Sequence, residues 1–170
     1  MNSLSSRKLA LCVLALCGLA LAASADAAEK VKVKFTKNAR QMHAESKINP
    51  GGGQGRELVS FFYVDQINTS QGLEFVEERG ANTDDQVDGN GKHSGVASDV
   101  LKNGDQIYQI YAGTHKTTTK EGGAWEVNYQ GVSTIIGGTG KYKSARGKLQ
   151  YKGRVTPDSL SEEDDGEIEY

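Results

Sequence analysis

The sequence predicts an all-β fold, an eight-stranded antiparallel β-barrel that occupies residues 28–155. Three observations support this prediction. Apolar and polar residues alternate with a period of two, which is typical of strands that have one buried face. Clusters rich in Gly, Asn and Asp separate the alternating segments, as turns do. After residue 27, no segment has the 3.6-residue apolar spacing of an amphipathic helix.

The predicted strands are, in order, 31–36, 41–48, 58–67, 73–79, 93–102, 106–115, 125–130 and 141–155. The predicted turns and loops between them are 49–55, 82–92, 102–105 and 120–123. Asn103-Gly104 between two such strands is a strong hairpin signal. This many antiparallel strands in one domain indicate a closed barrel or a sandwich, and closure removes exposed strand edges.

The N-terminus has the features of a secretory signal peptide. Arg7 and Lys8 precede a short apolar run, 9–23, and small residues follow. We expect cleavage after Ala27, with cleavage after Ala25 as the alternative. The mature protein, 28–170, is then periplasmic or secreted.

Both cysteines, Cys12 and Cys17, lie within this signal segment. The mature chain is therefore expected to have no thiol, no disulfide and no cysteine-based metal site. Its fold must be stabilised by the core alone.

The charge balance argues against nucleic acid as a partner. The net charge of the chain is −2, and removal of residues 1–27 takes away two basic residues and one acidic residue, which leaves −3. Nucleic-acid-binding domains are usually basic. Residues 161–170 hold six carboxylates and no basic side chain, so we expect 156–170 to be a solvated acidic tail, with an acidic interaction segment as the alternative.

The glycine-rich stretch 135–151 is not a phosphate-binding loop. A Walker motif requires Gly where Ile135 stands and Ser or Thr where Tyr142 stands. The dinucleotide pattern also fails, because Lys143 follows where Gly or Ala is required. We interpret the stretch as a tight turn between two strands.

The segment GGTGKYKSARG resembles the glycine-rich corner of the allene oxide cyclase and dirigent-like barrel superfamily. The motif residues that carry this resemblance are Gly137, Gly138, Thr139, Gly140, Tyr142, Ala145, Arg146 and Gly147. Residues 103–114 are similar to a hairpin of bacterial barrel relatives. The resemblance implies a cofactor-free barrel of calycin-type architecture, often trimeric, whose cavity holds a small lipid-like or phenolic molecule. It transfers no catalytic residue to this chain, and we expect Arg146 to face the solvent.

Alternation assigns a set of large side chains to the barrel interior. The candidate ligand-binding residues among them are Tyr63, Phe75, Tyr111, Trp125 and Tyr129, with Phe35, Met42 and Phe61 on the same face of their strands. A barrel of this size has room for side chains or for one small ligand. The sequence leaves open whether these rings surround a cavity or fill the core.

The candidate catalytic residues are carboxylates on strands. Asp99 and Glu74 are the preferred candidates, and Glu57 and Asp65 are further ones. A carboxyl that points inward would have a raised pKa, as proton-transfer chemistry often requires. We expect an exposed position for Asp99, and no nucleophile–histidine pair is indicated by spacing.

We expect no metal site. His43, His93 and His115 fall on different predicted strands without the spacing of a ligand set, so exposed histidines are expected. The oxygen-rich segment 84–90 departs from the EF-hand pattern at Gln86 and Gly95, which favours a polar turn over a calcium loop.

Three functions remain open on the sequence alone. The first is a barrel that binds a small apolar or phenolic ligand without a cofactor. The second is a cofactor-independent cyclase or isomerase. The third is an envelope structural or interaction protein with a filled barrel.

Overall fold

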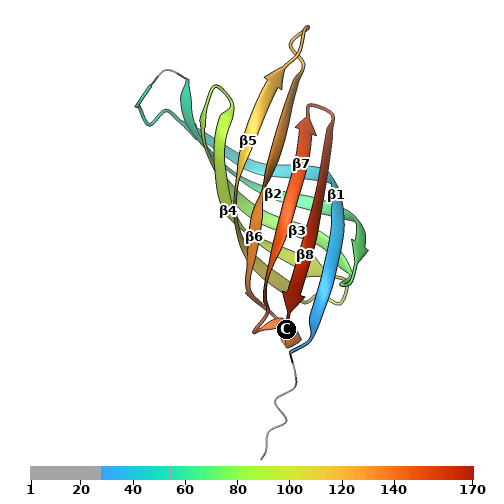
Figure 1. The fold of residues 1–170 in the computed structure, drawn as a ribbon. Helices are drawn as coiled ribbons and strands as arrows, with labels where there is room; N and C mark the ends of the chain where they lie inside the picture. Colours follow the sequence, from blue (N-terminus) through green and yellow to red (C-terminus); the bar gives the residue numbers. More distant parts are fainter. Residues whose placement is uncertain (1–27, 54) are drawn as a thin grey trace, which may run out of the picture.

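The described residues form one closed β-barrel. The computed structural model describes residues 28–53 and 55–170, so the predicted signal peptide, residues 1–27, lies outside them. The described strands are β1 (Lys30–Ile48), β2 (Arg56–Gln71), β3 (Phe75–Val87), β4 (Asn90–Leu101), β5 (Gln106–Thr119), β6 (Trp125–Gly138), β7 (Arg146–Thr156) and β8 (Ser159–Glu169). Each strand pairs antiparallel with the next, and β8 pairs with β1 to close the barrel (Figure 1). The predicted all-β, eight-stranded barrel is confirmed.

Strand β1 differs from the prediction of two strands at 31–36 and 41–48. It is one long strand whose pairing with β2 shifts at Thr36/Lys37, Lys37/Ala39 and Met42/Ala44. Bulges of this kind bend a strand and change which face its side chains occupy. The side chains of Val33, Phe35 and Lys37 are buried at a period of two, and Arg40 then lies on the same inner side at a spacing of three.

Strand β8 corrects the prediction of a solvated acidic tail. Residues 159–169, which we placed beyond the barrel, pair with β1 from Lys30↔Glu169 to Lys37↔Glu162 and with β7 along their whole length. The outward carboxylates of this strand meet lysines: Glu163 lies 3.1 Å from Lys34 and 3.3 Å from Lys152. The inward side chains, Glu162, Asp164 and Ile168, are buried. The barrel therefore extends to Glu169, beyond the predicted boundary at 155.

The segment 82–92, predicted as a loop, is mostly strand. β3 continues to Val87 and β4 begins at Asn90, so only Asp88 and Gly89 form the turn, with φ of 49° and 74°. Positive φ at both positions is the conformation of a type I′ hairpin turn, which Asp-Gly favours. Asp84 and Asp85 point to opposite faces of β3, and Asp85 pairs with Arg56 at 2.9 Å outside the barrel. The calcium-loop alternative is therefore wrong.

One end of the barrel is filled by an apolar plug. The plug consists of buried side chains from almost every strand: Val33, Phe35, Leu73, Phe75, Leu101, Ile107, Ile135, Leu149 and Ile168, with Tyr142 and Ala145. The last two belong to the glycine-rich connection between β6 and β7, which includes the 3₁₀ turn η1 (Gly140–Tyr142). Within the described residues, this turn is the one helical element, and no helix is long and apolar enough to cross a membrane.

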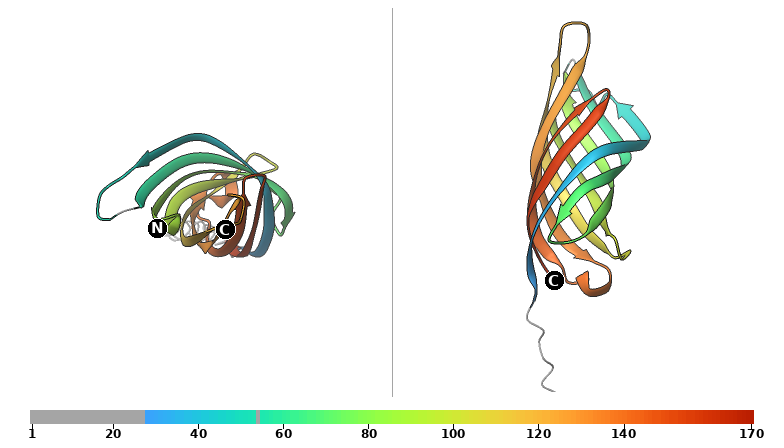
Figure 2. Two further views of the ribbon diagram at one scale, coloured as in Figure 1. Left: turned by 90° about the horizontal axis from the view of Figure 1, so that it is seen from above. Right: turned by 90° about the vertical axis from the view of Figure 1, so that its right-hand side faces the viewer.

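The other end of the barrel carries the hairpin turns that join β1 to β2, β3 to β4, β5 to β6 and β7 to β8. Figure 1 shows these turns at the end opposite to the C-terminus. Figure 2 shows that the β1–β2 hairpin leans away from the barrel axis. The two ends therefore differ: one is plugged, and the other is framed by hairpins.

Truncation after Thr156 tests the assignment of β8. We expect the truncated protein to lose its folded state, because β1 and β7 would keep unpaired edges and the plug would lose Ile168, which is fully buried. Far-ultraviolet circular dichroism and size-exclusion chromatography measure the outcome. The control is the double variant Glu163→Gln/Glu167→Gln, which removes outward charges but keeps the strand and should stay folded. A truncated protein that remains a folded monomer would restore the solvated-tail interpretation.

Candidate functional site

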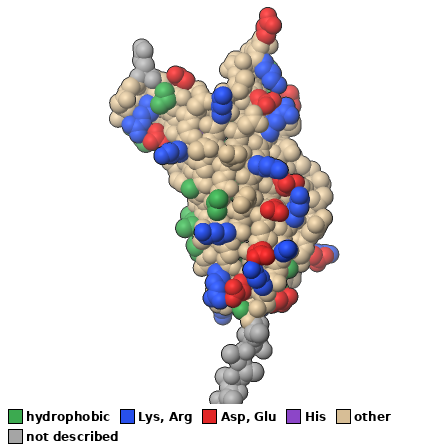
Figure 3. Space-filling view, in the orientation of Figure 1, with side chains coloured by type: hydrophobic (Ala, Val, Ile, Leu, Met, Phe, Trp, Pro, Cys, Tyr) green, Lys and Arg blue, Asp and Glu red, His purple; other side chains and the backbone are tan. Residues whose placement is uncertain are grey.

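A cavity of about 400 Å³ occupies the barrel between the plug and the hairpin end. Four tyrosines and two histidines line its wall together with charged and amide side chains, and Met42, Phe61, Trp125, Val127 and Val155 lie toward its mouth. The space-filling view shows the surface hollowed between the protruding hairpins at this end (Figure 3). The volume is within the range of small-molecule sites, which begins at about 300 Å³.

Four interior tyrosines each lie across a glycine of the neighbouring strand. The directly opposed pairs are Tyr63–Gly80, Tyr111–Gly95, Tyr129–Gly153 and Tyr151–Gly131. A Cβ at Gly153 would lie 2.2 Å from the Tyr129 ring, and one at Gly131 would lie 2.1 Å from the Tyr151 hydroxyl. Glycine therefore allows each ring to lie close against the barrel wall. This arrangement leaves the centre of the barrel open instead of filled with aromatic rings.

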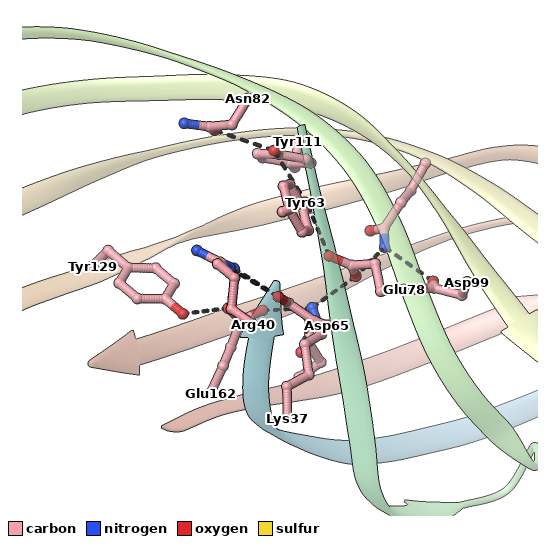
Figure 4. A network of polar contacts seen from close by, with 12 residues as sticks. Lys37, Arg40, Tyr63, Asp65, Glu78, Asn82, Asp99, Tyr111, Tyr129 and Glu162 are labelled. Carbon is pink, nitrogen blue, oxygen red and sulfur yellow. Dashed lines mark hydrogen bonds and ion pairs between the residues drawn. The ribbon is translucent and has the colours of Figure 1, made fainter. Parts of the chain in front are cut away.

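The floor of the cavity is a layer of buried charge centred on Lys37. Its Nζ lies 2.7 Å from Glu78, 2.6 Å from Glu162 and 3.3 Å from Asp164 (Figure 4). Burial opposes the charge on Lys37, but these carboxylates together raise its pKa well above the ordinary value. Lys37 is therefore a buried ammonium ion that links β1 to β3 and β8.

Arg40 forms the second cationic centre of this layer. Its guanidinium donates two hydrogen bonds to Asp65, at 2.8 and 2.6 Å, and lies 4.6 Å from the centroid of the Tyr63 ring. The hydroxyl of Tyr63 donates to Glu78 at 2.8 Å, and that of Tyr129 donates to Glu162. The cavity wall and its charged floor thus form one connected network.

Carboxyl groups outnumber cations in the described part of this layer. Burial raises the pKa of Asp99 well above its ordinary value, and the nearby Glu78 raises it further. Burial also raises the pKa of Asp164, whereas Lys37 and Arg40 outweigh burial at Glu162 and lower its pKa. Among the described residues, Asp99 Oδ1, Gln109 Oε1 and Asp164 Oδ2 are buried without a hydrogen-bond partner, although Asp164 Oδ2 lies within ion-pair distance of Lys37. Protons held on Asp99 and Asp164 would reduce this excess of negative charge.

Two histidines and an aspartate meet on the cavity wall. Asp84 on β3 is directly opposite His93 on β4, and His115 lies on β5 two residues beyond Gly113, the partner of His93. One potential ligand atom from each residue lies within 4.8 Å of the other two. Burial, and after it the neighbouring His115, lower the pKa of His93 to about 4, so the His93 ring is neutral at pH 7. The prediction of exposed histidines holds for His43 but is wrong for His93, which is 8% exposed, and for His115, which is partly buried on the cavity wall.

The predicted ligand-binding residues separate into three groups. Tyr63, Tyr111 and Tyr129 line the cavity wall, and Trp125 lies at its mouth. Phe75, by contrast, is packed in the plug, where its ring centroid is 4.9 Å from that of Phe35. It begins β3 at the plugged end, and the first buried residue of this strand in the charged floor is Glu78. Its assignment to the ligand-binding set is therefore corrected.

The predicted catalytic carboxylates also divide. Asp99 and Asp65 are both fully buried in the charged floor, so the expected exposed position of Asp99 is wrong. Glu74 lies in the β2–β3 turn with its side chain 76% exposed. Glu57 is exposed near the start of β2, where Gln86 of β3 donates to it at 3.2 Å. Neither of these two reaches the cavity.

The glycine-rich motif lies at the plugged end, away from the cavity mouth. Gly137, Gly138 and Gly147 flank the connection, and Gly140 has φ of 55° beside the Asp105 carboxylate. Arg146 is 69% exposed and pairs with Glu169, so it faces outward as expected. The motif serves to turn the chain over the plug.

Several central residues were not predicted from the sequence. They are Lys37, Arg40, Glu78, Tyr151, Glu162 and Asp164. Lys37 follows Val33 and Phe35 on the apolar face of β1, which is a weak signal. Glu78 gave no signal by alternation, because the register shift between Phe75 and Glu77 brings it to the inner face. For Glu162 and Asp164 the available signal was the alternation of Leu160 and Ile168 on the same face of an acidic strand.

Comparisons of this chain with protein-family models, with curated proteins and with solved structures found no match. The resemblance to allene oxide cyclases and dirigent-like proteins stays a prediction. The function is therefore inferred from the geometry of the cavity.

Replacement of Lys37 tests whether its buried ammonium holds the barrel closed. Lys37→Met leaves Glu78, Glu162 and Asp164 without their shared cation, so we expect a loss of about 3–5 kcal/mol in the free energy of unfolding. The matched control is Lys34→Met on the same strand, whose half-exposed ion pair with Glu163 should contribute less than about 1 kcal/mol. Urea unfolding measures both. Equal stabilities of the two variants would contradict a structural role for the cluster.

Asp99→Asn tests the protonation of the buried carboxyl. Because the pKa of Asp99 is raised in the folded state, the folded protein holds a proton there that the unfolded chain loses above about pH 4. The free energy of unfolding of the wild type should therefore fall, relative to that of Asp99→Asn, as the pH rises from about 4.5 to about 7.5. Throughout this range the pH is above the pKa of an aspartate in the unfolded chain.

The control for this prediction is Asp85→Asn, at an exposed carboxylate whose pKa is lowered by Arg56. Its stability relative to the wild type should stay constant over the same pH range. Urea unfolding at each pH gives the comparison. An advantage of Asp99→Asn that shrinks with rising pH would show that Asp99 is a stabilising anion.

Proposed function

We propose that the protein binds a small molecule with an apolar or phenolic body in the barrel cavity. The observation that supports this is the cavity itself, of about 400 Å³ and lined by aromatic rings and hydroxyl groups. Burial of an apolar ligand contributes about 25 cal/mol per Å² of apolar area removed from water. Tyrosine hydroxyls, Asn82 and the imidazoles supply polar partners for one polar group of the ligand.

The placement of the Tyr–Gly pairs supports binding over a purely structural role. A structural barrel gains stability when its centre is filled, since close packing is the usual state of protein interiors. Here the rings lie against the wall and the charged floor marks the lower limit of the open volume. An interior of this form is better suited to a ligand than to a solid core.

A cofactor-independent cyclase or isomerase is the second candidate function. It is favoured by the buried carboxyls at the cavity floor, where Tyr63 is bonded to Glu78 and Tyr129 to Glu162. Hydroxyl–carboxylate pairs of this kind can exchange a proton with a bound molecule. Asp99, with its raised pKa, lies behind Gln109 in the same layer, at 3.0 Å from the Gln109 amide.

Export, oligomerisation and family membership are part of this proposal. The signal-like segment 1–27 supports a periplasmic or secreted location. The glycine-rich corner supports kinship with the dirigent-like barrels, and with it a homo-oligomer, a trimer by resemblance. The ligand-binding proposal does not depend on any of the three.

A cavity-blocking variant tests the binding proposal. Val127→Phe adds a ring at the mouth, so we expect it to weaken binding about tenfold or more, since a blocked pocket costs the ligand its buried area. Trp125 is the one tryptophan of the chain and lies at the mouth, so its fluorescence reports occupancy. The titrants are 2-naphthol, dodecanoic acid and Nile red.

The matched control is Val132→Phe, the same change on the outer face of the same strand, where the side chain is 45% exposed. It should bind like the wild type. The proposal fails if none of the three titrants gives a saturable signal with the wild type. It also fails if Val132→Phe weakens binding as much as Val127→Phe does.

A further inference from the structure

We propose that Asp84, His93 and His115 form a binding site for a divalent transition-metal ion on the cavity wall, with Zn²⁺ as the ion whose preferences they fit. Imidazole is the commonest metal ligand in proteins, and two histidines with one carboxylate form a known catalytic type of zinc ligand set. This inference goes beyond the proposed function, since binding of an apolar ligand requires no metal. It also departs from the cofactor-free barrel that the family resemblance implies.

The strand register brings the three side chains together. Asp84 and His93 occupy directly opposed positions on β3 and β4, and His115 is on the next strand, diagonal to His93. The two imidazole rings have centroids 5.8 Å apart and are inclined by 31°. All three residues line the cavity. The site is therefore built on adjacent strands, which hold ligands more rigidly than loops do.

The spacing of the ligand atoms is close to that of a metal site. The three atoms lie within 4.8 Å of one another. Ligands of a tetrahedral zinc ion at about 2.1 Å are about 3.4 Å from each other. Side-chain rotations that move these atoms by about 1 Å would complete the set without a change in the strands.

Each of the three residues already has a polar partner among the residues that line the cavity. His93 Nε2 is 2.7 Å from the Tyr151 hydroxyl, His115 Nε2 donates to Gln86 Oε1 at 3.1 Å, and Asn82 donates to Asp84 at 2.5 Å. Metal-bound histidines and carboxylates commonly have such partners, which fix the orientation of the ligand. Because Gln86 Oε1 accepts from Nε2, a neutral His115 ring has its free lone pair on Nδ1.

The electrostatic setting also favours a cation. Carboxyl groups outnumber ammonium and guanidinium groups among the described residues that line the cavity. His93 is enclosed by the rings of Tyr111, Tyr129 and Tyr151, at 6.3, 6.1 and 5.7 Å between centroids. A shell of rings limits solvent access and so strengthens electrostatic attraction at the site. Three protein ligands leave a coordination position for water or for an atom of a cavity ligand.

Metal titration of the untagged protein tests the proposal. Cys12 and Cys17, which lie outside the described residues, are replaced by serine in every sample so that no thiolate contributes. Equilibrium dialysis against Zn²⁺ gives the affinity and the stoichiometry, and the visible absorption of bound Co²⁺ reports the ligand geometry. We expect one ion per chain, and we expect His115→Gln and Asp84→Asn each to weaken binding about tenfold or more.

The matched control is His43→Gln, which removes an exposed histidine on β1 and should bind like the wild type. His93→Gln should also abolish binding; if this buried substitution prevents folding, the other two ligand variants decide. The proposal is overturned if His115→Gln and Asp84→Asn bind as tightly as the wild type. It is also overturned if binding is not saturable or if His43→Gln loses it equally. Fluorescence titrations with the organic ligands are done in EDTA, so the two proposals can fail separately.

Discussion

The barrel depends on the ion cluster of Lys37 at the seam where its first and last strands meet. One ammonium ion satisfies carboxylates from β3 and β8, and the same carboxylates accept hydrogen bonds from the tyrosines of the cavity wall. A buried ion pair is costly to form, since both partners lose water, and more costly to break. The cluster therefore joins β1 to β3 and β8, and removal of one partner would leave uncompensated charge in the interior. It also sets the depth of the cavity, because nothing apolar can fill a layer of charge.

Along the barrel axis the interior changes from apolar to charged to aromatic. The plug supplies hydrophobic burial, and the layer above it holds Lys37 and Arg40 with their carboxylates. The tyrosine–glycine pairs then keep the upper half open. Under the proposed function, stability and ligand binding belong to opposite ends of the barrel. The glycine-rich corner belongs to the first task, and the hairpins that frame the mouth belong to the second.

The fold was predictable because alternation depends only on neighbours in the chain. Val33 and Phe35, or Ile107 and Tyr111, reveal an inner face without any knowledge of the partner strands. Tyr63, Tyr111 and Tyr129 of the cavity wall were found for the same reason, whereas Tyr151 was missed. Phe75 was misplaced because alternation gives the face of a strand but not the height along the barrel axis.

The charged floor and the histidine pair could not be predicted in this way. Charged residues are rarely fully buried, so an acidic stretch is expected in water, and only pairing with Lys37 makes burial of Glu162 and Asp164 tolerable. His93 and Asp84 meet because they are opposed across a hairpin, a relation that depends on where the turn lies. Placing that turn at Asp88-Gly89, instead of across 82–92, would have brought the two residues together.

Closure by β8 has a further consequence for biosynthesis. The contact between Lys37 and Glu162 joins residues 125 positions apart, and contacts of such long sequence separation form slowly. The seam cannot close until β8 has left the ribosome, so the barrel stays open while β1 to β7 are being synthesised.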